Sequence, residues 1–128
     1  MVVSFWVLLG SALGGLARYW LGVLVAGITG AAFPWGTLLI NVLGSLVIGL
    51  FAAATGERGL FSNFGATVDL RAFVMVGLCG GFTTFSAFSL QTLELLQAGR
   101  HAAAVFYMLG SVVSCVLAVW MGWMLGRG

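Results

Sequence analysis

The sequence predicts an all-α integral membrane protein, with residues 1–128 forming a single domain of four transmembrane helices. Composition indicates this class, because 62% of the 128 residues are apolar and only 6% are charged, whereas soluble domains carry about 25% charged residues. The mean hydropathy is +1.17. At about 20 residues for each span, the chain has room for four helices and short connections. No room remains for a soluble catalytic domain, so we expect that the protein is not an enzyme.

The first two expected spans cover residues 4–27 and 34–54. The first ends at a turn signal, Gly27-Ile-Thr-Gly30. No basic segment precedes it, so we expect a mature helix rather than a secretory signal peptide. The second begins near Pro34-Trp35, because proline in the first turn loses no helical hydrogen bond and tryptophan suits the headgroup level.

The third expected span, residues 70–96, follows a polar loop at residues 55–69 and is interrupted. Its centre reads Gly80-Gly81-Phe82-Thr83-Thr84-Phe85-Ser86-Ala87-Phe88-Ser89. Glycine and threonine are poor helix formers, so the helix should break here and leave carbonyl groups without partners. Lipid cannot satisfy such carbonyls, so the break must face a cavity, an ion or another protein surface. The fourth expected span, residues 102–125, has Trp120 and Trp123 near its far end.

Small residues recur every fourth position on three of these spans. Such rows let helix backbones approach closely in lipid. They are found at Gly10 and Gly14, at Ser45 and Gly49, and at Gly110, Ser114, Ala118, Gly122 and Gly126. The pattern favours tight packing and a homo-oligomer, and it says nothing about transport.

The charge is sparse, with five arginines against three acidic residues and a formal net charge of +2. This is too little for a nucleic-acid surface. Arg58, Arg71 and Arg127 lie on one expected side of the membrane and Arg100 on the other, so the positive-inside bias is small. Two interpretations stay open: a chain that inserts in both directions and pairs antiparallel with a copy of itself, or simply a short chain with few charges.

Polar side chains form a stripe on each of three spans. The stripes are Thr37, Asn41 and Ser45; Ser86, Ser89 and Thr92; and Tyr107, Ser111 and Cys115. Each stripe either joins helices by hydrogen bonds or lines a pore. Arg18 is the deepest charge, and it either snorkels to the interface or faces a watery vestibule that concentrates anions; we favour the vestibule.

Phe82, Phe85 and Phe88 are spaced three apart and should share one helix face. They serve either as ordinary packing or, with their electropositive ring edges, as a weakly donating lining for a small anion. His101 is expected to be a plain interfacial residue. Cys79 and Cys115 lie in apolar spans, where they should act as small hydrophobes rather than form a disulfide or a zinc site.

Three motifs make the whole chain resemble the small bacterial fluoride channels of the Fluc, or CrcB, family. The first two are Gly14-Gly-Leu-Ala-Arg-Tyr19 and Gly36-Thr-Leu-Leu-Ile-Asn-Val-Leu-Gly-Ser45. The third runs from Gly77 to Ser89 and contains the Gly-Gly-Phe-Thr-Thr-Phe-Ser segment, which is the most specific. The resemblance implies a dual-topology antiparallel homodimer in a bacterial inner membrane, with two parallel ion paths and a structural sodium ion at its centre.

The resemblance also implies roles for individual residues. The fluoride pore would be formed by Asn41, Thr84, Phe85, Ser86, Phe88, Tyr107 and Ser111; Arg18 would lie at the vestibule, and the backbone carbonyls of Gly80 and Thr83 would hold the sodium ion. The chain departs from the family pattern at Gln91, where glutamate is frequent, and at Cys115, where a hydroxyl would continue the stripe of Tyr107 and Ser111.

The expected function is passive, fluoride-selective conduction that exports fluoride from the cytoplasm. The alternative is a proton-coupled transporter of the small multidrug type with Glu94 as its proton carrier, although the first two spans lack the deep carboxylate that such an exporter needs. A third possibility is a structural membrane subunit without transport. Dye uptake that depends on a pH gradient and is lost in Glu94→Gln would indicate the second class.

Overall fold

The computed structural model describes residues 2–61 and 68–128, and all the secondary-structure elements within these residues are helices. In chain order the helices are α1 (Val2–Thr29), α2 (Trp35–Ala54), α3 (Val68–Arg71), the π-helix η2 (Ala72–Cys79), α4 (Gly80–Phe82), α5 (Phe85–Gln97) and α6 (His101–Gly126). The segments from α3 to α5 form one interrupted span, Val68–Gln97. Within the described residues, four spans are therefore long and apolar enough to cross a membrane. The chain is a multi-pass membrane protein, as its composition predicts.

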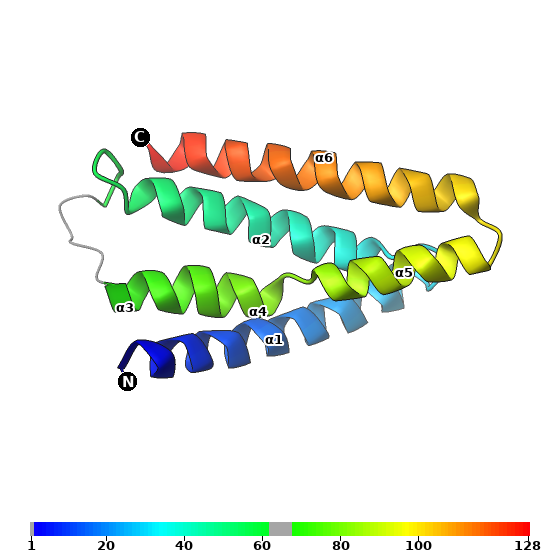
Figure 1. Ribbon diagram of the computed structural model, residues 1–128, viewed down its shortest axis with the longest axis horizontal. Coiled ribbons are helices and arrows are strands. Elements are labelled where there is room, and N and C mark those ends of the chain that lie inside the picture. Colours follow the sequence, from blue (N-terminus) through cyan, green and yellow to red (C-terminus); the bar gives the residue numbers. More distant parts are fainter. Residues whose placement is uncertain (1, 62–67) are drawn as a thin grey trace.

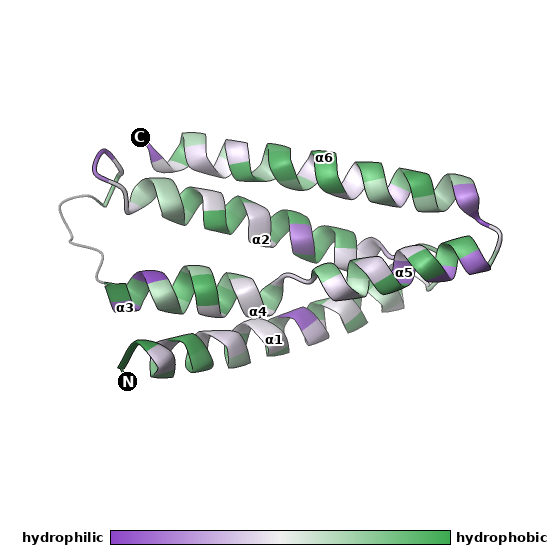
Figure 2. Ribbon diagram, in the orientation of Figure 1, coloured by the Kyte–Doolittle hydropathy of each residue, from purple (hydrophilic) through white to green (hydrophobic). Residues whose placement is uncertain are grey.

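Successive spans run antiparallel, so both ends of the chain lie at the same end of the bundle (Figure 1). Helix α6 lies beside α2, and the first half of the interrupted span lies beside α1. Hydrophobic residues predominate along all four spans (Figure 2). The break in the third span therefore lies at mid-depth in an otherwise apolar bundle.

The observed bounds agree closely with those that the sequence predicts. Helices α1 and α6 each extend one or two residues beyond the predicted spans at both ends. Pro34 precedes α2 rather than occupying its first turn, and its carbonyl accepts from Leu38 N at 3.2 Å. Of the predicted loop at residues 55–69, positions 62–67 lie outside the described residues.

Helix α1 crosses the third span at glycine positions on both partners. Gly10 faces Gly77, where a methyl group on either glycine would meet the other residue's Cα at about 3 Å. Gly81 lies equally close to the backbone of Ser11, with a Cβ-to-Cα distance of 2.9 Å. The predicted Gly10–Gly14 row is thus confirmed as a packing surface. Its partner, the Gly77–Gly81 pair, has the same four-residue spacing and was not anticipated.

Helices α2 and α6 form the second close contact. A methyl group on Gly49 would meet the Val119 backbone, and one on Gly122 would lie 2.8 Å from Leu50 N. Gly126 packs equally tightly against the end of α2. Gly110 has open space around it, so the small-residue row of α6 is used for packing over its C-terminal half. The contact of α1 with the third span and the contact of α2 with α6 hold the four spans around the break.

Candidate functional site

The third span breaks at its threonine pair. Thr83 has φ −81° and ψ 159°, and Thr84 has φ −153° and ψ 117°, both in the extended region. The predicted break is confirmed, but the expectation that its glycines unwind is wrong: Gly80 is helical, with φ −63° and ψ −39°, and Gly81 lies inside α4. β-branched threonine suits extended backbone, whereas Gly81 is needed for the close contact with α1.

Thr84 starts the second half of the span by capping α5. Its hydroxyl accepts from Ala87 N at 3.2 Å and lies 3.3 Å from the Ser86 hydroxyl. Threonine is a favoured N-cap residue because its oxygen satisfies an amide that has no helical partner. The break is therefore a helix end followed by a new helix start, rather than a disordered stretch.

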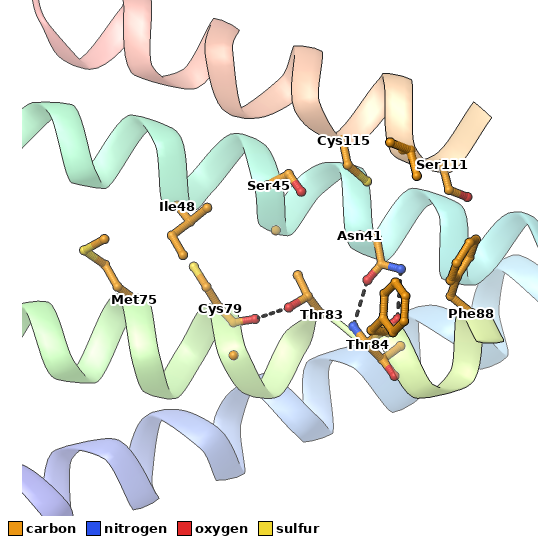
Figure 3. A pocket seen from close by; sticks show the side chains of 14 residues that line it. Asn41, Ser45, Ile48, Met75, Cys79, Thr83, Thr84, Phe88, Ser111 and Cys115 are labelled. Carbon is orange, nitrogen blue, oxygen red and sulfur yellow. Dashed lines mark hydrogen bonds between the residues drawn. The ribbon is translucent and has the colours of Figure 1, made fainter. Parts of the chain in front are cut away.

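Asn41 on α2 stabilises the break from the side. Its Nδ2 donates to Thr84 O at 3.0 Å, and its Oδ1 accepts from Thr84 N at 2.7 Å (Figure 3). In an unbroken helix, Thr84 N would donate to the Gly80 carbonyl. The asparagine amide takes the place of that helical partner, so the Gly80 carbonyl is released from its helical hydrogen bond.

Gly44, one turn along α2 from Asn41, lets the break approach. A methyl group there would collide with the side chain of Thr83 and lie 3.3 Å from Phe82 Cδ1. The Thr83 hydroxyl and amide both donate to Cys79 O, at 2.8 and 2.9 Å. On the α1 side, Arg18 Nη1 lies 3.5 Å from Thr83 O, a long hydrogen bond that brings the predicted vestibule arginine directly to the break.

A cavity of about 320 Å³ lies between α2, the interrupted span and α6. It brings together side chains that are far apart in the sequence (Figure 3). Its lining consists of Asn41, Gly44, Ser45, Ile48, Met75, Cys79, Gly80, Thr83, Thr84, Phe85, Phe88, Ser111, Val112 and Cys115. Five of the seven residues predicted for the pore and both residues predicted for the sodium site are among them.

Ser111 is the exceptional polar group of this cavity. The residue is 6% exposed, and its Oγ has no hydrogen-bond partner within the described part of the chain. Buried hydroxyls are nearly always satisfied, so an unsatisfied one marks a position where a polar ligand or water can bind. Ser111 belongs to the part of the cavity wall that α6 contributes (Figure 3).

Phe85 and Phe88 lie on the α5 side of the cavity, with ring centroids 5.3 Å apart and planes inclined by 47°. The expectation that Phe82 shares their face is wrong, because the extended threonine pair separates α4, which contains Phe82, from α5. Phe85 is 76% exposed. One side of the aromatic pair is therefore uncovered in a single chain.

Tyr107 and Ser86, the other two residues predicted for the pore, lie next to the cavity rather than on its wall. Tyr107 is fully buried, its ring centroid is 5.1 Å from that of Phe88, and its hydroxyl donates to Gln91 Oε1 at 2.9 Å. Ser86 is exposed and lies against the Thr84 hydroxyl. Sequence reasoning did not pair Gln91 with Tyr107, since the two residues are 16 positions apart on different helices.

A second cavity, of about 510 Å³, lies at the end of the bundle beyond Tyr107. It includes Thr37, Gln91, Glu94 and Arg100 in its lining, and Arg100 also donates to the Ala32 carbonyl. Glu94 is exposed in this end cavity and is absent from the central one. The hydrogen-bonded Tyr107–Gln91 pair joins the two regions, because Gln91 lines the end cavity while the Tyr107 ring packs on Phe88 of the central one.

Comparison with a family model and comparison with individual related proteins agree with each other. The family model described as CrcB-like protein, Camphor Resistance (CrcB), matches residues 5–123. A protein of Methylocella silvestris named fluoride-specific ion channel FluC is 55% identical over 117 residues, covering 91% of this chain and 87% of its own. Proteins of the same name from Paramagnetospirillum magneticum and Opitutus terrae are 53% and 50% identical, over 91% and 95% of this chain and 88% and 90% of theirs.

Proposed function

Because this chain belongs to the CrcB-like family, whose curated relatives are named fluoride-specific ion channels, we propose that it is a passive, fluoride-selective channel. The observation that carries the proposal is the Ser111 hydroxyl, buried and without a partner on the wall of the central cavity. A hydroxyl donates one hydrogen bond, and a small anion in the cavity would accept it. Ion channels are not an enzyme class.

The chemistry of the cavity suits a small, tightly hydrated anion. Conduction requires groups that replace water without holding the ion too strongly. Ser111 offers an O–H group, Asn41 retains the second N–H of its amide beyond the bond to Thr84, and Phe85 and Phe88 offer electropositive ring edges. These are weak, separate donors, so an anion could enter and leave easily. Thr84 and Ser86 would continue the path by hydroxyl contacts. Tyr107, whose hydroxyl proton goes to Gln91, would border the path with its ring, and Arg18 would raise the local anion concentration.

An antiparallel homodimer would complete the site. Gly80 and Phe85 line the cavity yet are exposed in one chain, and lipid could not satisfy the released Gly80 carbonyl. A second copy would cover this face. By two-fold symmetry each copy would contribute an equivalent cavity, which gives two pores. The nearly balanced arginines of the loops would permit insertion in both directions.

The backbone carbonyl oxygens at the break are suitable ligands for a structural sodium ion. Hard cations take oxygen ligands, and no cluster of three or more His, Cys, Asp or Glu side chains in the described ranges could hold a metal instead. The carbonyls of Gly80 and Thr83 would hold the ion, two from each copy. Gly80 fits because its carbonyl is released, and the Thr83 carbonyl keeps a second lone pair beside its long hydrogen bond from Arg18. The ion would join the two copies and take no part in anion transfer.

The direction of transport follows from the driving force. In a bacterial inner membrane, the potential is negative inside and drives anions outward through an uncoupled pore. Fluoride enters the cell as neutral hydrogen fluoride and dissociates in the less acidic interior. A passive channel would therefore export cytoplasmic fluoride and needs no carboxylate as a proton carrier. The exposed position of Glu94 at the end cavity does not favour the proton-coupled alternative.

Fluoride efflux from proteoliposomes tests the proposal. We expect the wild-type protein to release fluoride far faster than chloride, and Phe85→Ile and Phe88→Ile each to slow fluoride by at least about tenfold, or about 1.4 kcal/mol in barrier height. Phe5→Ile is the matched control, because Phe5 is 58% exposed on α1 and does not line the cavity. Equal chloride release, or unchanged fluoride release in both cavity variants, would refute the proposal.

A further inference from the structure

Sulfur atoms line part of the central cavity. Met75 and Cys79 come from the π-helix η2 and Cys115 from α6 (Figure 3). Both thiols are free. They differ in access, because Cys79 is 3% exposed whereas Cys115 is half-buried. The more accessible thiol therefore lies on the helix that also contributes Ser111.

Cys115 follows Ser111 by one helical turn, so the two side chains share a face of α6. Both line the same cavity of about 320 Å³. The unpartnered Ser111 hydroxyl, 6% exposed, independently indicates that this face receives a ligand or water. A molecule that reaches Ser111 from within the cavity is also brought beside the Cys115 sulfur.

We propose that Cys115 is a modification site inside this cavity, at which a small, neutral, thiol-reactive electrophile attaches and closes the cavity to ions. The closure rests on the proposed function, whereas the attachment does not. Thiol reactions proceed through the thiolate and require access, and Cys115 is the more exposed of the two thiols on the cavity wall. The cavity volume restricts the site to small reagents. A group added to Sγ would fill space beside Ser111 and displace whatever the hydroxyl binds.

Methyl methanethiosulfonate is the appropriate reagent, because it is small and uncharged and needs no oxidant. The Cys115 sulfur attacks the sulfenyl sulfur of the reagent, as in thiol–disulfide exchange. A new sulfur–sulfur bond forms, the bond between the two sulfur atoms of the reagent breaks, methanesulfinate leaves, and the thiol proton passes to solvent. The product is a methyl disulfide on Cys115 that dithiothreitol removes.

The first measurement is the site of attachment. Folded protein in proteoliposomes is treated briefly, quenched and analysed by peptide mass spectrometry. We expect the methylthio group on Cys115, with Cys79 modified only after unfolding in detergent such as dodecyl sulfate. Modification of Cys79 before Cys115, or a Cys115 that reacts only after unfolding, would overturn the proposal. This measurement gives its answer whether or not the protein conducts fluoride.

The second measurement is fluoride efflux, with each variant compared with its own untreated sample. Treatment should lower wild-type efflux by at least about tenfold, and dithiothreitol should restore it. Cys115→Ser should lose this sensitivity, and Cys79→Ser, the matched control, should keep it. Full modification of Cys115 with unchanged efflux would overturn the closure. An untreated protein without fluoride efflux would instead refute the proposed function and leave the attachment result standing.

Discussion

The α2–α6 contact and the break in the third span lie side by side in the same bundle but are built in opposite ways. In the first, Gly49 and Gly122 remove side chains so that two regular helices touch backbone to backbone. In the second, Gly44 removes a side chain so that an irregular segment, Thr83 and Thr84, can approach α2 and bond to Asn41. The α2–α6 contact leaves no space between the two helices at these glycines, whereas the break has a cavity beside it.

The difference shows where polar groups can be placed in an apolar bundle. Regular helices satisfy their own backbone, so the α2–α6 contact needs no polar side chain. The break releases backbone groups, and Asn41 satisfies the amide and carbonyl of Thr84 from a neighbouring helix. Since both the N–H and the C=O group of the asparagine amide bond to Thr84, Asn41 fixes the shape of the cavity wall.

Removing Asn41 should have the largest effect. In Asn41→Leu, the N–H and C=O of Thr84 lose their partners, and each unsatisfied buried group costs about 1–3 kcal/mol. We expect a strongly lowered melting temperature in detergent and no measurable fluoride efflux. Asn41→Asp keeps the acceptor for Thr84 N and loses the donor to Thr84 O, so its melting temperature should lie between the two. If Asn41→Leu melts like the wild type, the asparagine does not hold the break.

A substitution in the α2–α6 contact should lower the stability less than Asn41→Leu does. In Gly122→Ala the new methyl group would lie 2.8 Å from Leu50 N, so the α2 and α6 backbones must separate. Overpacking of this kind costs about 1–3 kcal/mol. Gly110→Ala is the matched control on the same helix, because Gly110 has open space around it, and alanine favours a helix over glycine by about 0.5–1 kcal/mol. Thermal unfolding in detergent measures the melting temperature of both variants. Equal melting temperatures would contradict the close contact between α2 and α6 at Gly122.

The same two regions show what the sequence can predict. The bounds of the spans follow from hydropathy, which belongs to each residue alone, and they agree with the structure to within a few positions. The presence of a break follows from its glycine and threonine content. Its position does not, because Gly81 serves packing against Ser11 and remains helical. Local composition cannot tell a glycine that loosens a helix from one that lets helices touch.

The contacts that shape the cavity were even harder to predict from the sequence. Asn41 and Thr84 are separated by 43 positions, and their pairing depends on how α2 passes the break. The signals that were present are local: Thr84 as an N-cap residue three positions before Ala87, and the Gly77–Gly81 spacing on the third span. The residues predicted from the resemblance gathered at one cavity, apart from Tyr107 and Ser86 on its border and Arg18 on the α1 side.

The smallest effect should come from Gln91, which lies on the regular helix α5 and lines the end cavity. Its Oε1 accepts from the Tyr107 hydroxyl at 2.9 Å, and a glutamate could accept the same bond, so Gln91→Glu should fold normally. The new side chain can carry a negative charge that a neutral amide cannot. We expect fluoride efflux to fall by about two- to tenfold as pH rises and the carboxyl ionises, because a like charge beside the path repels an anion.

Wild-type efflux, corrected for hydrogen fluoride leakage through empty liposomes, should change little over the same pH range. Gln91→Leu separates charge from hydrogen bonding, since it loses the Tyr107 bond without gaining a charge, and its efflux should be independent of pH. A pH-independent Gln91→Glu would place the ion path away from the Tyr107–Gln91 pair. The end cavity would then have no part in conduction, and the path would be confined to the central cavity.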